Sequence, residues 1–190
     1  MDSLKDALVQ ATIKEGALNP SNKRFSTKTI AERCGVSEFT LFSLFKTKDA
    51  LVDEALAVVR NDFVSSAQKS SILSKDVSAL VKALIHHAFM VPEYTIFLAN
   101  YGFWTGKEAE DPKTKQAAFA ADVAAAKKAF IFLKDYPDEV VYLLWNYIWR
   151  QINYAVEEVY DGVSNDSPEY RNEVAQRVSE GFLSFREEAR

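Results

Sequence analysis

Two short amphipathic segments joined by Cys-Gly-Val-Ser lie between residues 26 and 51 and restrict the folds open to this chain. Residues 27–34 and 37–45 are each shorter than the roughly 12–15 residues that make an isolated helix stable in water. Gly35 is expected to end the first helix, because glycine adopts the left-handed cap conformation without steric cost. Ser37 is expected to cap the second helix. The two helices must therefore be held by each other and by further helices, which is the helix-turn-helix arrangement.

The rest of the chain also predicts helices rather than strands. Only 6 glycines and 5 prolines occur among 190 residues, whereas a β-rich fold uses more of both in its tight turns. Long runs that contain Ala, Leu, Lys and Glu favour helix. We expect an all-α fold of about nine helices, the first of them ending at Gly16. The predicted helices cover residues 2–15, 27–34, 37–45, 48–68, 74–91, 93–104, 112–134, 137–160 and 168–190.

Basic residues are concentrated around the helix-turn-helix. Between Lys23 and Lys48, six basic residues stand against two acidic ones, in a chain whose formal net charge is −4. A local basic region on an acidic body suits binding to phosphate groups. An ordinary solvated surface is the alternative explanation for such a charge run.

The sequence TKTIAERCGVSEFTLFSLFKTKDAL, from Thr27 to Leu51, closely resembles the TetR family of bacterial transcriptional regulators. The resemblance implies a three-helix helix-turn-helix DNA-binding domain over residues 1–48. It also implies a larger helical effector-binding and dimerisation domain over residues 49–190. Such a protein binds double-stranded operator DNA as a homodimer. It typically acts as a repressor that an unidentified small-molecule effector releases.

The same resemblance supplies candidate DNA contacts. Thr27 lies where the family commonly touches phosphate, and Thr40 lies where the recognition helix looks towards the groove. Lys48 lies at the start of the next helix. Its positive charge and the free backbone N–H groups of that first turn suit a phosphate. The candidate set is Thr27, Lys28, Ser37, Glu38, Phe39, Thr40, Phe42, Ser43 and Lys48.

Four recognition-helix positions depart from the usual family pattern. Leu44 replaces a polar or aromatic residue, and the other three are candidate DNA contacts. Glu38 replaces a basic or small residue, Phe39 replaces glycine or alanine, and Phe42 replaces tyrosine. A glutamate can accept a hydrogen bond from cytosine N4, and a phenylalanine can contact thymine methyl groups. Two hypotheses therefore stay open: a regulator with an unusual operator, and a helical ligand-binding or protein-interaction module that has lost operator recognition.

Aromatic residues of the larger domain offer the wall of an effector pocket. Ordinary core packing is the alternative for each of them. The candidate effector-binding residues are Phe89, Phe97, Tyr101, Trp104, Trp145 and Trp149.

The last two predicted helices offer a dimer interface. An apolar stripe on the final helix, next to an apolar helix before it, predicts a four-helix interface between two copies. Asn146, Arg150 and Asn153 recur at helical spacing, and they would orient a ligand, cross the interface or face water. The candidate interface residues are Tyr154, Tyr170, Val174, Val178, Phe182 and Phe185.

No arrangement typical of catalysis is recognisable. His86 and His87 point in different directions on a helix, Cys34 is the single cysteine, and no glycine-rich phosphate loop occurs. We expect no enzyme activity, no cofactor and no metal site. No apolar run reaches the ~20 residues of a membrane span, and the interrupted apolar N-terminus does not resemble a secretory signal. The sequence therefore predicts a cytoplasmic protein without membrane contact, and the resemblance to the TetR family implies that it is bacterial.

Overall fold

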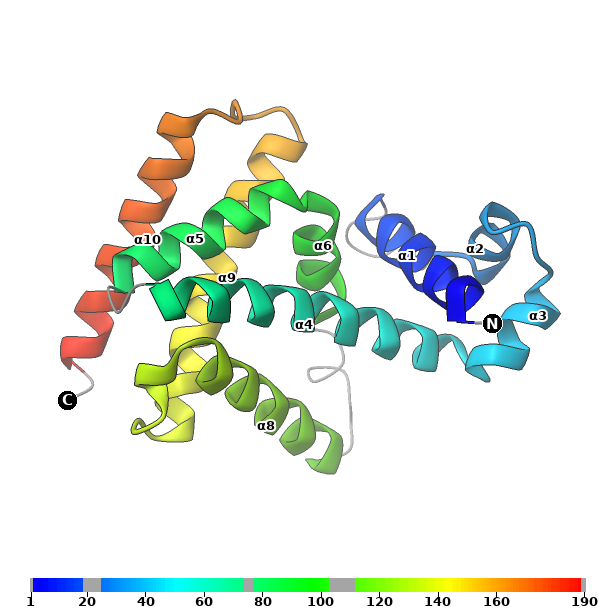
Figure 1. Ribbon diagram of the computed structural model, residues 1–190, viewed down its shortest axis with the longest axis horizontal. Coiled ribbons are helices and arrows are strands. Elements are labelled where there is room, and N and C mark those ends of the chain that lie inside the picture. The colour runs from blue at the N-terminus through cyan, green and yellow to red at the C-terminus, as the bar shows by residue number, and fades with distance from the viewer. Residues whose placement is uncertain (1, 19–24, 74–76, 103–111, 189–190) are drawn as a thin grey trace.

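The computed structural model describes residues 2–18, 25–73, 77–102 and 112–188, and the regular structure of these residues is helical (Figure 1). The all-α prediction is therefore confirmed for the described part of the chain, which contains nine α-helices. No described helix is both long and apolar enough to cross a membrane. The elements are α1 (Asp2–Leu18), α2 (Thr27–Arg33), α3 (Glu38–Phe45), α4 (Lys48–Leu73), α5 (Val77–Met90), α6 (Pro92–Phe97), the π-helical turn η1 (Leu98–Gly102), α8 (Pro112–Ala129), the 3-10 turn η2 (Ile131–Leu133), α9 (Asp138–Tyr160) and α10 (Pro168–Glu188).

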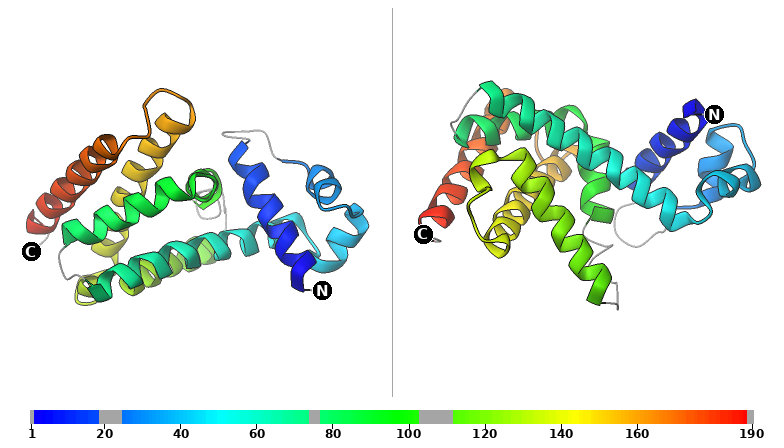
Figure 2. Two further views of the ribbon diagram at one scale, coloured as in Figure 1. Left: turned by 45° about the horizontal axis from the view of Figure 1, so that its top comes forward. Right: turned by 60° about the horizontal axis from the view of Figure 1, so that its bottom comes forward.

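Helices α1, α2 and α3 form a head at one end of the molecule, and α4 runs from this head into the helical body (Figures 1 and 2). In the body, α4 packs against α5 and α8, while α9 packs against α8 and α10. Helix α4 is 26 residues long and uninterrupted. The head and the body therefore share one continuous helix.

A single hydrophobic core joins head and body. In the head, Ile30, Ala31, Leu41 and Phe45 are buried, and Val36 packs against them from the turn. These residues hold α2 and α3 together and attach them to α1 and α4, because each of these neighbouring pairs is in contact. Short helices gain their stability from such packing and not from intrinsic propensity.

Gly16 does not end the first helix, as the sequence suggested, because α1 continues to Leu18. A Cβ atom at Gly16 would lie 2.5 Å from Cδ2 of Phe97 and 2.8 Å from the Tyr101 ring. The side-chain amide of Asn100 also donates to the Gly16 carbonyl, at 3.0 Å. The glycine therefore permits close packing of α1 against α6 and η1.

Other helix boundaries also differ from the predicted ones. Helix α4 extends to Leu73, five residues past its predicted end, and α8 stops at Ala129. Phe130 then adopts an extended conformation (φ −120°, ψ 95°) and is buried against Trp145. The predicted helix over residues 93–104 divides into α6 and η1, and its last two residues lie outside the described part.

The apolar stripe of α10 is covered within the chain. Val174, Val178 and Phe182 are fully buried, and α10 packs against α5 as well as α9. The expectation that these three residues face a second copy is therefore wrong, because the chain's own core already holds them. Tyr170 is half-buried and donates to Glu158 at 2.6 Å. Tyr154 is 60% exposed, and the Phe185 side chain lies outside the description.

Candidate DNA-binding head and effector pocket

The turn between α2 and α3 is closed by two backbone hydrogen bonds. The Gly35 N–H donates to the Glu32 carbonyl at 3.1 Å, and the Val36 N–H donates to the Ala31 carbonyl at 3.0 Å. This pair is the Schellman pattern, which needs a left-handed residue after the helix. Gly35 supplies it, with φ +68°. The predicted turn is confirmed.

Helix α3 begins at a side-chain cap. The Thr40 N–H donates to Oγ of Ser37 at 3.2 Å, and the two hydroxyl groups of these residues are 3.0 Å apart. Ser37 is therefore the N-cap that the sequence predicted, and its interaction fixes where α3 starts. Ser26 precedes α2 in the N-cap position, but its side chain makes no capping hydrogen bond.

One face of α3 is left to solvent at the far end of the head (Figure 1). Phe39 is 84% exposed and Phe42 is 37% exposed, whereas Leu41 and Phe45 on the opposite face are buried. Ser43 is exposed too, and its hydroxyl donates to the Thr40 carbonyl at 2.7 Å. A helix with one buried face and one free face at a molecular tip has the form needed to enter a major groove.

Two of the residues predicted to contact phosphate instead form hydrogen bonds within the head. The Thr27 hydroxyl donates to Oε1 of Glu38 at 2.5 Å, which connects the first turn of α2 to that of α3. Nζ of Lys48 donates to the Phe25 carbonyl at 2.6 Å and lies 4.2 Å from the centroid of the Phe25 ring. Lys28 remains largely exposed and lies 3.9 Å from Glu32.

The roles of Phe25 and Lys46 are visible only in the structure. Phe25 is buried, and its ring centroid lies 5.5 Å from that of Tyr101 in η1. Lys46 ends α3 with φ +66°, and its Nζ donates to the Ser43 carbonyl at 3.1 Å. A lone phenylalanine in a polar loop and a lysine in a basic run do not indicate such contacts. A positive φ at a non-glycine residue is visible only in the structure.

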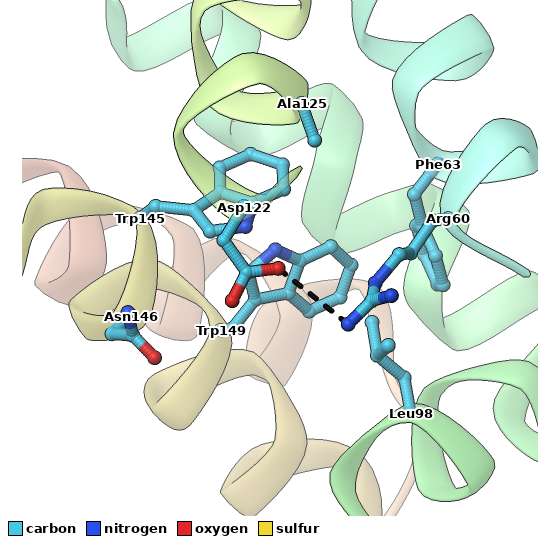
Figure 3. A pocket seen from close by; sticks show the side chains of 8 residues that line it. All are labelled: Arg60, Phe63, Leu98, Asp122, Ala125, Trp145, Asn146 and Trp149. Atoms are coloured by element: carbon cyan, nitrogen blue, oxygen red, sulfur yellow. Dashed lines mark ion pairs between the residues drawn. The ribbon is translucent and has the colours of Figure 1, made fainter. Parts of the chain in front are cut away.

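The body contains a small, partly open cavity between α4, η1, α8 and α9 (Figure 3). Its volume is about 20 Å³, room for a single water molecule. Nη2 of Arg60 and Oδ1 of Asp122 are 3.6 Å apart across it. Burial raises the pKa of the Asp122 carboxyl, and the positive charge of Arg60 offsets this effect only in part. The lining residues are Arg60, Phe63, Leu98, Asp122, Ala125, Trp145, Asn146 and Trp149.

The predicted effector residues separate into three places. Trp145 and Trp149 line the cavity, with ring centroids 5.5 Å apart. Phe97 and Tyr101 stack on each other at 4.8 Å, close to Gly16 of the head. Phe89 packs against Tyr170, and Trp104 lies outside the described residues.

Sequence reasoning missed Arg60 and Asp122 as lining residues. Asp122 interrupts an alanine-rich run, AAFAADVAAAKKA, and this lone acidic residue was a usable signal. Arg60 on α4 gave no comparable signal. Within the described part of the chain, no group of three or more His, Cys, Asp or Glu residues is placed to hold a metal ion.

Comparison with known proteins identifies the head. Residues 23–55 match the family model described as bacterial regulatory proteins, tetR family. The head is of the TetR type. The matched region contains the whole pattern from Thr27 to Leu51 that carried the resemblance, so the predicted resemblance is confirmed.

The whole fold is also that of TetR-family regulators. A TetR family transcription regulator from Marinobacter aquaeolei VT8 is 19% identical, with a TM-score of 0.69 over 94% of this chain and 95% of that chain. The TetR-like regulator LfrR from Mycobacterium smegmatis, solved in complex with proflavine, is 15% identical, with a TM-score of 0.62 over 96% of each chain. At these identities the likeness establishes the TetR-family fold alone.

One curated relative shares more sequence over a shorter stretch. An uncharacterised HTH-type transcriptional regulator of Bacillus subtilis (strain 168), YvkB, is 36% identical over 81 residues. The match spans 43% of this chain and only 37% of the length of YvkB.

Proposed function

We propose that this protein is a transcriptional repressor that binds operator DNA as a homodimer and is released by a small-molecule effector. The observation that carries the proposal is the exposed face of α3, fixed by the Gly35 turn and the Ser37 cap at the tip of a TetR-type head. Such a face is suited to reading base edges in a major groove. The basic residues around it suit phosphate contacts.

The exposed side chains of α3 define what the head would read. Phe39 offers an apolar ring, which suits a thymine methyl group. The Glu38 carboxylate, which already accepts a hydrogen bond from the Thr27 hydroxyl, could accept another from the N4 amino group of cytosine. Phosphate contacts then come from backbone N–H groups at the start of α4 and from Lys28, whose side chain is largely exposed.

A second copy of the chain fits the outer face of α9 and α10. Leu143 and Tyr154 are 53% and 60% exposed, and they share a face of α9 because eleven residues make about three turns. An open groove of about 630 Å³ lies next to Tyr154, between α9 and α10. The buried Oδ1 of Asn153, which lines this groove, has no hydrogen-bond partner among the described residues. A partner helix in this groove would cover the exposed side chains.

The dimer has a direct test. Tyr154→Glu places a charge on the exposed face and should convert the dimer into monomers in size-exclusion chromatography with light scattering. Leu18→Glu, at a residue of α1 in the head that is 53% exposed, should leave the dimer intact. A wild-type chain that elutes as a monomer at all concentrations would contradict the dimer proposal.

The π-helical turn η1 supplies a route from the effector pocket to the head. Leu98 at its start lines the cavity, and Asn100 donates to the Gly16 carbonyl of α1 at 3.0 Å. Tyr101 packs on Phe25, whose carbonyl and ring hold Lys48. A ligand that displaces Leu98 would therefore disturb the contacts between η1 and the head, and would favour dimer conformations that no longer fit DNA. Single π-helical turns occur frequently at functional sites.

The rival function is a helical ligand-binding or protein-interaction module without operator recognition. The engaged Thr27 hydroxyl and the engaged Lys48 ammonium favour it, because both groups would have to leave internal partners to reach phosphate. Glu38 adds a negative charge at the same face. Salt dependence separates the two functions, since phosphate contacts release counterions and an interaction module makes none.

The deciding experiment is selection of duplexes from a random pool, followed by affinity measurements at several salt concentrations. A regulator should enrich a sequence with two-fold symmetry, and the logarithm of its affinity should fall steeply with the logarithm of salt. Phe39→Ala should weaken binding to the enriched site, whereas Ile131→Ala, at a similarly exposed apolar residue of the body, should not. Failure to enrich any sequence, together with a flat salt dependence, would favour the interaction module.

A further inference from the structure

The Asp122 carboxylate is the least compensated charge in the cavity. Its side chain is only 18% exposed, and among the described residues its single partner is Arg60. The 3.6 Å between Nη2 and Oδ1 exceeds the usual length of a hydrogen bond. Burial raises the pKa of this carboxyl, and the neighbouring guanidinium offsets that effect only in part. A mostly buried carboxylate gains most from an additional donor or positive charge.

Three aromatic rings, Phe63, Trp145 and Trp149, line the same cavity as this carboxylate. The Trp145 and Trp149 rings meet edge to face, with centroids 5.5 Å apart, and Phe63 meets Trp149 at 4.5 Å. Figure 3 shows the Asp122 carboxyl group next to the two indole rings, and the dashed line that joins it to the Arg60 guanidinium crosses the Trp149 ring in this view. Tryptophan faces attract cations through the negative charge of the ring face. An acidic group beside two indole rings is thus a setting that stabilises an organic cation.

Two further polar groups at the cavity, on Trp149 and Asn146, could bind a planar ligand that carries hydrogen-bonding groups on more than one side. Nε1 of Trp149 is buried without an acceptor among the described residues. The Asn146 amide donates to the Tyr142 carbonyl at 2.8 Å, which leaves its oxygen as an acceptor. The site therefore offers two acceptors, Asp122 and Asn146, and one indole donor.

Arg60 makes an anionic ligand the competing choice. Its guanidinium, however, already faces Asp122 and takes part in further interactions within the chain. The group in need of compensation is therefore the carboxylate. We propose that this pocket selects a compact planar organic cation, whose N–H donors reach the Asp122 carboxylate while its ring lies against Trp145 and Trp149. This inference rests on the proposed effector role of the pocket.

Entry of such a ligand requires the cavity to open, because about 20 Å³ holds only one water molecule. Leu98 is the lining residue that belongs to the π-helical turn, and it is displaced when η1 moves. The apparent affinity is then lowered by the fraction of molecules that are open. Ligands of equal size need the same opening of the cavity, so the ratio of their affinities does not depend on the fraction of open molecules.

Benzamidine, benzamide and benzoate provide the matched probes. They share a ring and nearly the same shape, but carry charges of +1, 0 and −1 at neutral pH. Isothermal titration of the full chain should show benzamidine binding about tenfold or more tighter than benzamide, as expected for a charge-assisted hydrogen bond in a mostly buried site. Benzoate should bind most weakly.

Three variants identify the source of the preference. Asp122→Asn keeps the shape of the side chain and should bring benzamidine and benzamide to within about twofold, because the charge-assisted bond is lost. Arg60→Gln should strengthen benzamidine binding, because it removes a like charge. Asp138→Asn, at a surface carboxylate paired with Lys127, should leave the tenfold preference unchanged.

The outcomes separate this inference from the proposed function. Tightest binding of benzoate, absence of binding by all three probes, or an unchanged preference in both Asp122→Asn and Arg60→Gln would overturn the cation site. DNA affinity is measured separately without any probe. Steep salt dependence of DNA binding combined with any of these results would overturn the ligand class and leave the regulator intact.

Discussion

Gly35 and Gly162 allow stability and DNA binding to be separated, because each ends a helix with the same hydrogen-bond pattern. At Gly162 the N–H donates to the Val159 carbonyl at 3.1 Å, and the next N–H donates to the Glu158 carbonyl at 2.8 Å. The φ angles are +68° at Gly35 and +73° at Gly162, and a Cβ atom at either would meet no heavy atom within 4 Å. The cost of alanine is therefore confined to the backbone.

That cost can be estimated for both glycines. A left-handed conformation costs a non-glycine residue roughly 1–2 kcal/mol. In a chain of this size each kcal/mol lowers the melting temperature by roughly 2–4 °C. Gly35→Ala and Gly162→Ala should each melt about 2–8 °C below the wild type. Gly35→Val should cost more, because a β-branched side chain tolerates this conformation less well.

The functional consequences of the two variants should differ. Gly35→Ala alters the angle between α2 and α3 and should reduce the affinity for the selected duplex severely, measured by fluorescence anisotropy well below the melting temperature. Gly162→Ala should lower stability to a similar extent and retain affinity, because the turn between α9 and α10 belongs to the body and lies far from α2 and α3 (Figure 1). Unchanged melting of Gly35→Ala would refute the turn argument. Equal loss of affinity in both variants would refute a specific role for the α2–α3 turn in DNA binding.

Three further predictions test the cap, the charge of α3 and a surface ion pair. Ser37→Ala removes the acceptor of the Thr40 N–H and should cost about 1 kcal/mol of unfolding free energy, measured by urea titration; an unchanged midpoint would show that the cap is not stabilising. Glu38→Gln keeps an acceptor for the Thr27 hydroxyl but removes a negative charge, so affinity for random duplex at low salt should rise several-fold, and an unaltered affinity would place Glu38 away from phosphate. The Arg171 hydrogen bond lowers the pKa of Asp166, so this pair stabilises the fold above the ordinary aspartate pKa, and its contribution is lost as pH falls through the lowered value. The difference in melting temperature between the wild type and Asp166→Asn should therefore shrink below about pH 4, and a constant difference between pH 6 and pH 3 would contradict the pairing.

The parts of the fold that could be predicted from the sequence are those with local causes. Gly35 and Ser37 form their hydrogen bonds with residues a few positions away, so the local sequence is enough to predict the turn and the cap. Gly16 shows the limit of this reading, because its role depends on rings more than eighty residues away. The prediction that the apolar stripe of α10 faces a second copy was wrong for the same reason. The apolar periodicity of α10 was read correctly, but the stripe is buried within the chain, where α10 packs against α5.

The candidate pocket was predictable only in its aromatic part. Trp145 and Trp149 lie on one predicted helix, and their spacing places them on one face. Arg60 and Asp122 lie on different helices. Arg60 resembles an ordinary solvated charge in its own segment, and the lone Asp122 in its alanine-rich run does not indicate which residue it meets. Their encounter depends on how α4 and α8 pack, which no short-range pattern specifies.

Thr27 and Lys48 are the two candidate phosphate contacts that already have partners within the chain, and these partners belong to different parts of the molecule. Thr27 is held by Glu38, and both residues belong to the head, so this contact can exchange for phosphate without any change in the body. Lys48 is held by Phe25, and the Phe25 ring packs on Tyr101 of η1. A ligand that acts through Leu98 and η1 can therefore alter the availability of Lys48 but not that of Thr27. It follows that an effector should change the affinity of a Thr27→Val protein for DNA as strongly as that of the wild type, whereas Lys48→Met should weaken the response to the effector.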